Sequence, residues 1–240
     1  MTATHELAAA SSADPAGPAD PADPARPAAD APLSLLLREG TRSEHEAAEG
    51  SRFVTDLLDG RLTVRAYADL ALQLHTVYTA LEEVGEQVRR TPAGAGVVFD
   101  ELARVPALES DLAHLLGPGW RDSAAPHPAT AGYAAAIRAG GDDVGAYVAH
   151  AYTRYLGDLS GGQVIGRMVQ RHYGIPDEGV AFYAFPAIPK PKPFKDLYRA
   201  RVDALELDAA GREAVVAEAR SAFRHNRALF AALAEVHRAA

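Results

Sequence analysis

The stretch His-Ala-Tyr-Thr-Arg-Tyr-Leu-Gly-Asp-Leu-Ser-Gly-Gly-Gln-Val-Ile-Gly-Arg, residues 150–167, sets four glycines into what the surrounding pattern predicts to be one long buried helix. Apolar residues recur with helical spacing on both sides of the glycines, from Val144 to Leu159 and from Ile165 to Val169. Each glycine in a helix costs about 1 kcal/mol relative to alanine, so the four forgo about 4 kcal/mol in a domain whose net stability is about 5–15 kcal/mol. We infer that the missing side chains serve another purpose.

The spacing of the glycines suggests what that purpose is. Gly157 and Gly161 are four residues apart, so they clear one continuous strip of helix surface that another backbone or a flat ligand can approach closely. Glycine also lets a helix bend where its hydrogen bonds loosen. Tight helix packing, or a break between two helices, also explains the glycines. Asp158 and Ser160 are polar groups inside the same strip, and they favour a ligand.

The run from Tyr152 to Gln163 resembles the distal-helix motif of heme oxygenases along its whole length. The resemblance implies a soluble, bacterial-type enzyme that cleaves heme to biliverdin, carbon monoxide and ferrous iron, using dioxygen and electrons from an external donor. It also implies an all-α fold, a single multi-helix domain with heme sandwiched between a proximal helix and a kinked, glycine-rich distal helix.

Composition limits the other possibilities. The chain has 240 residues, of which 48% are hydrophobic and 23% charged, which is typical of one large globular domain. The net charge of −8 argues against a nucleic-acid partner, and the lack of cysteine excludes disulfides, thiolate metal sites and a cysteine nucleophile. Because we find neither a signal sequence nor an apolar run long enough to be a membrane anchor, we expect a soluble, cytoplasmic protein. We also expect it to be a monomer.

The chain divides into two parts. Residues 1–32 are rich in alanine, proline and aspartate and have no periodic apolar face, which predicts a disordered tail. Residues 33–240 are predicted to form the all-α domain, and the segment 174–193, with its prolines and aromatics, to be an ordered loop. Helical periodicity predicts helices over residues 33–50, 67–84 after a Thr63 N-cap, 97–103, 107–116, 130–139, 143–173, 194–205 and 208–238.

His45 is the histidine that the pattern singles out. It follows Leu37 and Thr41 at helical spacing, so a helix over 33–50 would turn it inward. A lone histidine there is commonly a satisfied core residue, but Glu49, one turn later, can accept the proton of its second ring nitrogen. The segment 36–49 is similar to the proximal helix of heme oxygenases. The resemblance assigns His45 as the axial ligand of the iron of heme b, with Glu49 as its partner and Thr41 in the binding face.

Basic residues are predicted to bind the two heme propionates. Lys195 and Arg199 are four residues apart, so they extend from one helix face, as a solvated surface would also have them. The run from Phe194 to Arg201 resembles the propionate-binding helix of the family. The same resemblance adds Arg38 and Tyr152 to the propionate contacts, although family members commonly have lysine at the position of Arg38. It also implies that Phe230 contacts the heme.

The resemblance also assigns the distal side of the heme. It puts Gly157 and Gly161 against the porphyrin, with Asp158 one step back, holding ordered waters that deliver protons. Tyr78, Arg154 and Asn226 match positions that surround this water network. Each of the three is also explained as a buried hydrogen-bonding residue.

The source of electrons lies outside the chain, because the sequence has no flavin or nicotinamide fingerprint. We expect a separate reductase or ferredoxin, which would dock on basic residues at Lys190, Lys192, Lys195 and Arg201. Two alternatives remain. A non-catalytic heme carrier or sensor would need His45 but not Asp158, and a di-iron carboxylate protein would need Glu-x-x-His pairs, which the sequence lacks.

Overall fold

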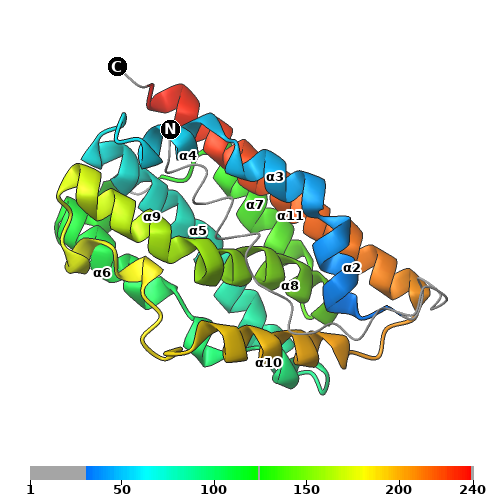
Figure 1. Ribbon diagram of the computed structural model, residues 1–240. Helices are drawn as coiled ribbons and strands as arrows, with labels where there is room; N and C mark the ends of the chain where they lie inside the picture. Colours follow the sequence, from blue (N-terminus) through cyan, green and yellow to red (C-terminus); the bar gives the residue numbers. More distant parts are fainter. Residues whose placement is uncertain (1–30, 124, 239–240) are drawn as a thin grey trace.

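The protein is described by a computed structural model that covers residues 31–123 and 125–238. Within these residues every regular element is a helix, which confirms the all-α prediction, and the helices form one bundle (Figure 1). The predicted disordered tail, 1–32, lies outside the described residues except for its last two positions. In the described part, no helix is both long and apolar enough to cross a membrane.

The described helices follow one another with short connections. They are α2 (Leu33–Gly40), α3 (Arg42–Glu49), α4 (Arg52–Leu58), α5 (Val64–Val88), α6 (Val105–Leu116), α7 (Pro128–Ala139), α8 (Val144–Ala151), the π turn η5 (Tyr152–Leu156), α9 (Gly157–Tyr173), α10 (Pro191–Asp203) and α11 (Ala209–Val236). Single 3-10 turns lie between them, namely η2 (Gly94–Gly96), η3 (Asp100–Leu102), η4 (Trp120–Ser123), η6 (Asp177–Gly179) and η7 (Ala181–Tyr183).

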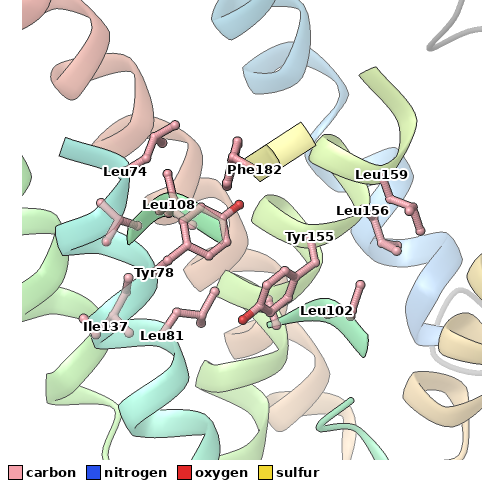
Figure 2. Packing of buried hydrophobic residues seen from close by; sticks show 14 of the residues in the cluster. Leu74, Tyr78, Leu81, Leu102, Leu108, Ile137, Tyr155, Leu156, Leu159 and Phe182 are labelled. Atoms are coloured by element: carbon pink, nitrogen blue, oxygen red, sulfur yellow. The ribbon is translucent and has the colours of Figure 1, made fainter. Parts of the chain in front are cut away.

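Helix α5 is the centre of the core. It contacts α6, α7, α8 and α11, and its predicted apolar stripe from Tyr67 to Val84 is buried. Figure 2 shows part of this core, with Leu81 and Ile137 near the two tyrosines Tyr78 and Tyr155. The Thr63 side chain accepts a hydrogen bond from the Ala66 N–H at 3.2 Å, so the predicted N-cap is confirmed.

The predicted single helix over 33–50 is wrong in one respect, because it breaks into α2 and α3 at Thr41. The Thr41 hydroxyl donates to the Leu37 carbonyl at 2.7 Å, and a side chain bonded in this way bends a helix. The His45 N–H still donates to the Thr41 carbonyl at 2.9 Å. His45 therefore keeps its place one turn after Thr41 although the axis changes direction.

Three other boundaries differ from the prediction. Residues 97–103 contain only the turn η3, because the Glu82 carboxylate accepts the N–H groups of Arg104 and Val105, at 2.6 and 3.0 Å, and so starts α6 at Val105. Helix α10 begins at Pro191, since proline fits the first turn of a helix. Helix α4 was missed because seven residues show too little periodicity.

The predicted helix over 143–173 is present but not uniform. It begins after Asp143, whose carboxylate caps the Ala146 N–H at 2.9 Å, and it ends at Gly174, which has the left-handed φ of 66°. Between α8 and α9 the chain widens into the π turn η5. Such a turn is a common cause of a kink. The irregularity of the distal helix thus lies one turn before its first glycine.

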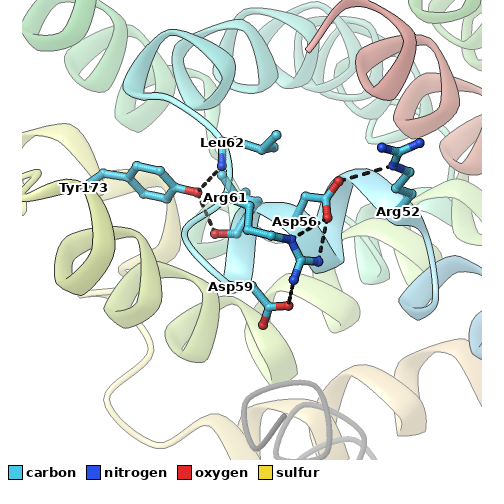
Figure 3. Close-up of polar contacts among 7 residues, drawn as sticks. Arg52, Asp56, Asp59, Arg61, Leu62 and Tyr173 are labelled. Atoms are coloured by element: carbon cyan, nitrogen blue, oxygen red, sulfur yellow. Dashed lines mark hydrogen bonds and ion pairs between the residues drawn. The ribbon is translucent and has the colours of Figure 1, made fainter. Parts of the chain in front are cut away.

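The far end of α9 is fixed to the turn between α4 and α5 (Figure 3). The Tyr173 hydroxyl donates to the Leu57 carbonyl at 2.8 Å and accepts from the Leu62 N–H at 3.4 Å. In the same turn, Asp56 accepts hydrogen bonds from the Arg61 guanidinium.

Two buried charged residues hold the segment that crosses beside α9. Asp111 on α6 accepts the N–H groups of Ala181 and Phe182 at 2.7 and 2.9 Å. The Arg104 guanidinium donates to the carbonyls of Phe182 and Ala184. Asp111 is 0% exposed and Arg104 is 6% exposed. We call residues 179–185 the strap, because its backbone is clamped by both charges.

We predict that Asp111→Asn will remove a pH-dependent contribution to stability. Burial raises the pKa of Asp111 from 3.8 to about 6, so the folded state binds this proton more tightly than the unfolded chain does. The contribution is complete below about pH 4 and disappears as the pH rises through about 6. The loss of stability in the variant should therefore be about 1–2 kcal/mol larger at pH 5 than at pH 7.5. Urea unfolding of both proteins measures this, and an equal difference at both pH values would contradict it.

Candidate active site

The four glycines of α9 form two pairs that meet different surroundings. A Cβ built at Gly157 or Gly161 meets no atom of the described residues within 4 Å. A Cβ at Gly162 would lie 3.1 Å from Cδ1 of Tyr183, and one at Gly166 would lie 3.2 Å from Cβ of the same residue. The pairs are five residues apart, so they face directions about 140° apart on the helix.

The two glycine pairs therefore have different roles. Gly162 and Gly166 let the strap residue Tyr183 pack tightly against the helix, which is the packing explanation for glycine. Gly157 and Gly161 leave a clear strip of backbone, as required for the close approach of a flat group. The packing explanation from the sequence is therefore confirmed for Gly162 and Gly166, and the close approach of a ligand to Gly157 and Gly161 stays a prediction.

A polar cluster borders the cleared strip. The Tyr78 hydroxyl donates to Oδ2 of Asp158, and the Arg154 guanidinium donates to Oδ1 of Asp158 at 3.5 Å and to Oδ1 of Asn226 at 2.8 Å. The Arg154 Cζ also lies 5.3 Å from the centre of the Tyr78 ring. The fold thus brings together four predicted residues from α5, η5, α9 and α11.

Burial controls the electrostatics of this cluster. Removal from water raises the pKa of the Asp158 carboxyl well above its ordinary value, because the charged form loses its hydration. Asp158 consequently keeps a proton at a higher pH than a surface aspartate does. Such a group is suited to hold a proton close to a ligand and release it there.

His45 lies on α3 and is half-buried. Its ring makes an edge contact with Phe223 of α11, with the centres 5.8 Å apart. Phe223 and Asn226 are three residues apart, so they share one face of α11. That face therefore links His45 to the polar cluster around Asp158. The predicted partner Glu49 ends α3, and its side chain falls outside the described part of the structure.

Positive charges lie beside Tyr152, at the start of η5. Burial raises the pKa of the Tyr152 hydroxyl, and the charges of Arg199 and Arg38 act in the opposite direction, which reflects their proximity. Helix α10, which carries Arg199, contacts α2, which carries Arg38. Lys195 reaches the glycine helix itself, with Nζ 3.4 Å from the Ser160 hydroxyl. The predicted basic residues thus meet at one edge of the glycine strip.

Two other predicted residues have contacts of their own. Thr41 is buried and donates its hydroxyl to the backbone of α2, as described above. The Phe230 ring is half-buried and stacks on Phe53, with the centres 6.5 Å apart and the planes at 9°. Ligand contact by either residue stays a prediction.

Sequence reasoning missed the residues of the strap and its clamp. Tyr183 fills the second glycine pair, and Phe182 packs edge-on against Tyr78 with centres 5.3 Å apart (Figure 2). Asp111 and Arg104 hold the backbone of both aromatics. The second glycine pair is a signal that something must fill it, but the sequence does not say which residue does.

Comparison with known proteins decides the family. A sequence model of the family described as heme oxygenase matches residues 31–232. The chain belongs to the heme oxygenase family. Its reaction is the degradation of heme to biliverdin, carbon monoxide and iron.

Relatives and solved structures agree with this assignment. The enzyme is 41% identical to heme oxygenase 1 of Rattus norvegicus over 214 residues, which cover 86% of this chain and 74% of the rat protein. Its fold is similar to heme oxygenase-1 of the cyanobacterium Synechocystis in complex with heme, with a TM-score of 0.82, 37% identity and coverage of 86% and 94% of the two chains. The fold is also similar to the heme oxygenase of Leptospira interrogans, with a TM-score of 0.80 and 34% identity. That match covers 84% of this chain and 100% of the Leptospira chain.

The residues of the site fit heme. The strip at Gly157 and Gly161 is open where a Cβ would otherwise project, and a flat macrocycle needs such a surface. His45 offers an imidazole, which is a common axial ligand of heme iron. Arg38 and Arg199 supply positive charge for two carboxylates. Within the described part of the chain, no three His, Cys, Asp or Glu side chains come together as a group that could hold a metal ion by themselves.

We predict opposite effects for two neighbouring substitutions in α9. Gly161→Ala should raise the free energy of unfolding of the heme-free protein by about 1 kcal/mol, because alanine favours a helix and its Cβ meets no atom of the described residues, yet it should weaken heme binding. Gly162→Ala gains the same propensity but must displace Tyr183, so its free energy of unfolding should be at least about 1 kcal/mol lower than that of Gly161→Ala.

Urea unfolding and heme titration of both variants measure these effects. Unchanged heme affinity in Gly161→Ala would show that this glycine does not serve the close approach of heme.

Proposed function

We propose that three groups of residues share the work of heme degradation in this enzyme. His45 binds the iron, the basic residues and Tyr152 bind the propionates, and the cluster of Tyr78, Arg154, Asp158 and Asn226 handles protons. The observation that carries the proposal is the buried carboxyl of Asp158 beside a strip of helix that Gly157 and Gly161 leave clear.

Heme b, when bound, supplies both the iron at which dioxygen reacts and the meso carbon that is oxidised. The enzyme's contribution is to orient this substrate. Gly157 and Gly161 allow it to lie against the helix backbone, and the kink at η5 sets the direction in which that backbone runs. His45 would bind the opposite face of the heme, and the edge contact with Phe223 holds the imidazole ring of His45 in place.

Proton delivery is the task of Asp158. Tyr78 donates to Oδ2 and Arg154 to Oδ1, so the carboxyl is held in one orientation, and Asn226 accepts from Arg154 to keep the guanidinium in place. The raised pKa lets Asp158 hold a proton and deliver it through an ordered water, while an exposed aspartate would be ionised. A carrier or sensor of heme has no use for such a group.

The rim of the site binds the propionates and receives electrons. Arg38, Lys195 and Arg199 provide positive charge at one edge, and arginine at position 38 offers a planar, bidentate donor in place of the lysine common in the family. Lys190, Lys192 and Arg201 extend this charge along and beside α10, where we expect a reductase or ferredoxin to dock. We also propose that the enzyme works as a monomer in the cytoplasm.

We predict that Asp158→Asn will separate binding from turnover. The amide has nearly the same shape but cannot hold or release a proton at neutral pH, so heme should bind with unchanged affinity while biliverdin forms about a hundredfold more slowly. Absorption spectroscopy with a reductase under oxygen measures both quantities. Asp122→Asn, on an exposed turn, is the control. Biliverdin formation at the wild-type rate in Asp158→Asn would refute the assigned role.

We predict that His45→Ala will lose the axial ligand and that added imidazole will restore it. The expected result is a shifted Soret band in the variant's heme complex, which returns to the wild-type position when imidazole occupies the space of the missing side chain. His172→Ala, on the last turn of α9, should leave the spectrum unchanged. An unaltered Soret band in His45→Ala would mean that another residue binds the iron.

A further inference from the structure

A cavity of about 350 Å³ lies between α5, the segment 98–105 and the helix that carries Tyr147 and Tyr155. Its lining shares no residue with the heme site described above. Its volume is within the range of about 300–1,000 Å³ that is usual for small-molecule sites.

Three hydroxyl groups on the wall of this cavity lack hydrogen bonds. Tyr147 is 4% exposed and Tyr155 is 3% exposed, and among the described residues no partner lies within hydrogen-bonding distance of either phenol oxygen. The Thr79 hydroxyl is also buried without a partner in this part of the chain. Leaving a buried hydroxyl unpaired costs about 1–3 kcal/mol, so the Thr79 hydroxyl, together with two phenol oxygens that open onto the same cavity, indicates a ligand that pairs with them.

Carboxylates dominate the charge of the cavity. Glu82, Glu83 and Glu86 line it from α5 and Asp100 lines it from η3, while Arg89 is the single positive residue of the lining. Arg89 is already paired with Asp100 and with Glu86, the latter at 3.2 Å. A positively charged ligand would balance the excess of negative charge, and an anionic one would be repelled.

Glu82 is the carboxylate best placed to meet a ligand. Its Oε1 accepts two backbone N–H groups, from Arg104 and Val105, and within the described chain its side chain has no cationic partner at ion-pair distance. Glu83, by contrast, pairs with Arg138 at 2.8 Å. Glu82 is also the most buried of the three glutamates, and burial raises its pKa although its two backbone hydrogen bonds and the charge of Arg104 act in the opposite direction.

The remaining wall is apolar. Its apolar side chains outside α5 are those of Val98, Phe99, Ala103 and Val105. Phe99 is held by aromatic contacts with Phe194, at 5.3 Å between ring centres. Tyr155 stands beside Tyr78 at 5.6 Å, and Figure 2 shows the two hydroxyls pointing in opposite directions, so the Tyr155 hydroxyl does not belong to the Asp158 cluster.

We propose that this cavity binds a small primary amine, with its ammonium group between Glu82 and the phenol oxygens and its apolar body against Val98, Phe99 and Ala103. An ammonium group has three donors and no acceptor. It can therefore donate to the carboxylate and to two of the hydroxyl oxygens together, whereas a neutral alcohol leaves the negative charge uncompensated.

The proposal is tested by titration of the full chain with phenethylamine in a calorimeter, with and without one equivalent of heme. The matched probes are 2-phenylethanol, which is neutral, and 3-phenylpropanoate, which is anionic. We expect saturable binding of the amine, at least tenfold weaker binding of the alcohol and none of the acid. The affinity should be the same with heme bound, and the Soret band should not move. Equal binding of amine and alcohol, or displacement of the amine by heme, would overturn the proposal.

Variants locate the binding. Ala103→Leu should fill the cavity and abolish binding of phenethylamine. Tyr155→Phe should weaken it about tenfold without lowering Tm, because the hydroxyl has no bond within the described chain to lose. Tyr133→Phe is the matched control, since that hydroxyl is buried without a partner in the described chain and does not line the cavity. Retained affinity in both Ala103→Leu and Tyr155→Phe, or equal losses in Tyr155→Phe and Tyr133→Phe, would show that the amine binds elsewhere.

Discussion

A helix that gives up side chains so that a ligand can approach its backbone has little of its own to hold it in position. In this enzyme the segments that pack against α9 hold it in position. Tyr183 fills the strip at Gly162 and Gly166, and the Tyr173 hydroxyl fixes the far end of the helix to the turn before α5. The open strip at Gly157 and Gly161 depends on this support, because without it the bare helix would have no fixed position in the bundle.

The strap that supports α9 is in turn held in place by two charged side chains. Asp111 and Arg104 are buried charges that bind the N–H and carbonyl groups of the strap from two sides. A strap with many unpaired backbone groups could not be buried otherwise, since each would lose its hydration without compensation. The same clamp sets Phe182 against Tyr78, so core packing reaches directly to the residue that donates to Asp158.

Most of the fold could be read from apolar periodicity, and the failures share a physical cause. The long stripes of α5 and α11 were predicted closely because many repeats average out local exceptions. The break at Thr41, the short turn at Asp100–Leu102 and the π turn at Tyr152–Leu156 each depend on a specific hydrogen bond or a local change of helix geometry. A single feature of this kind does not change the apolar periodicity, because that periodicity is averaged over several helical turns.

The sequence by itself determined the kinds of chemistry available: an imidazole at His45, a glycine pair four residues apart, and a carboxyl at Asp158 in the motif that identified the family. Only the tertiary structure decided which glycine pair stays open, since Tyr183 is seventeen or more residues away along the chain from either glycine that it covers. It also decided that Phe223 and Asn226 join the two sides of the site across α11. Such contacts depend on where distant segments meet, and local residue spacing carries no record of that.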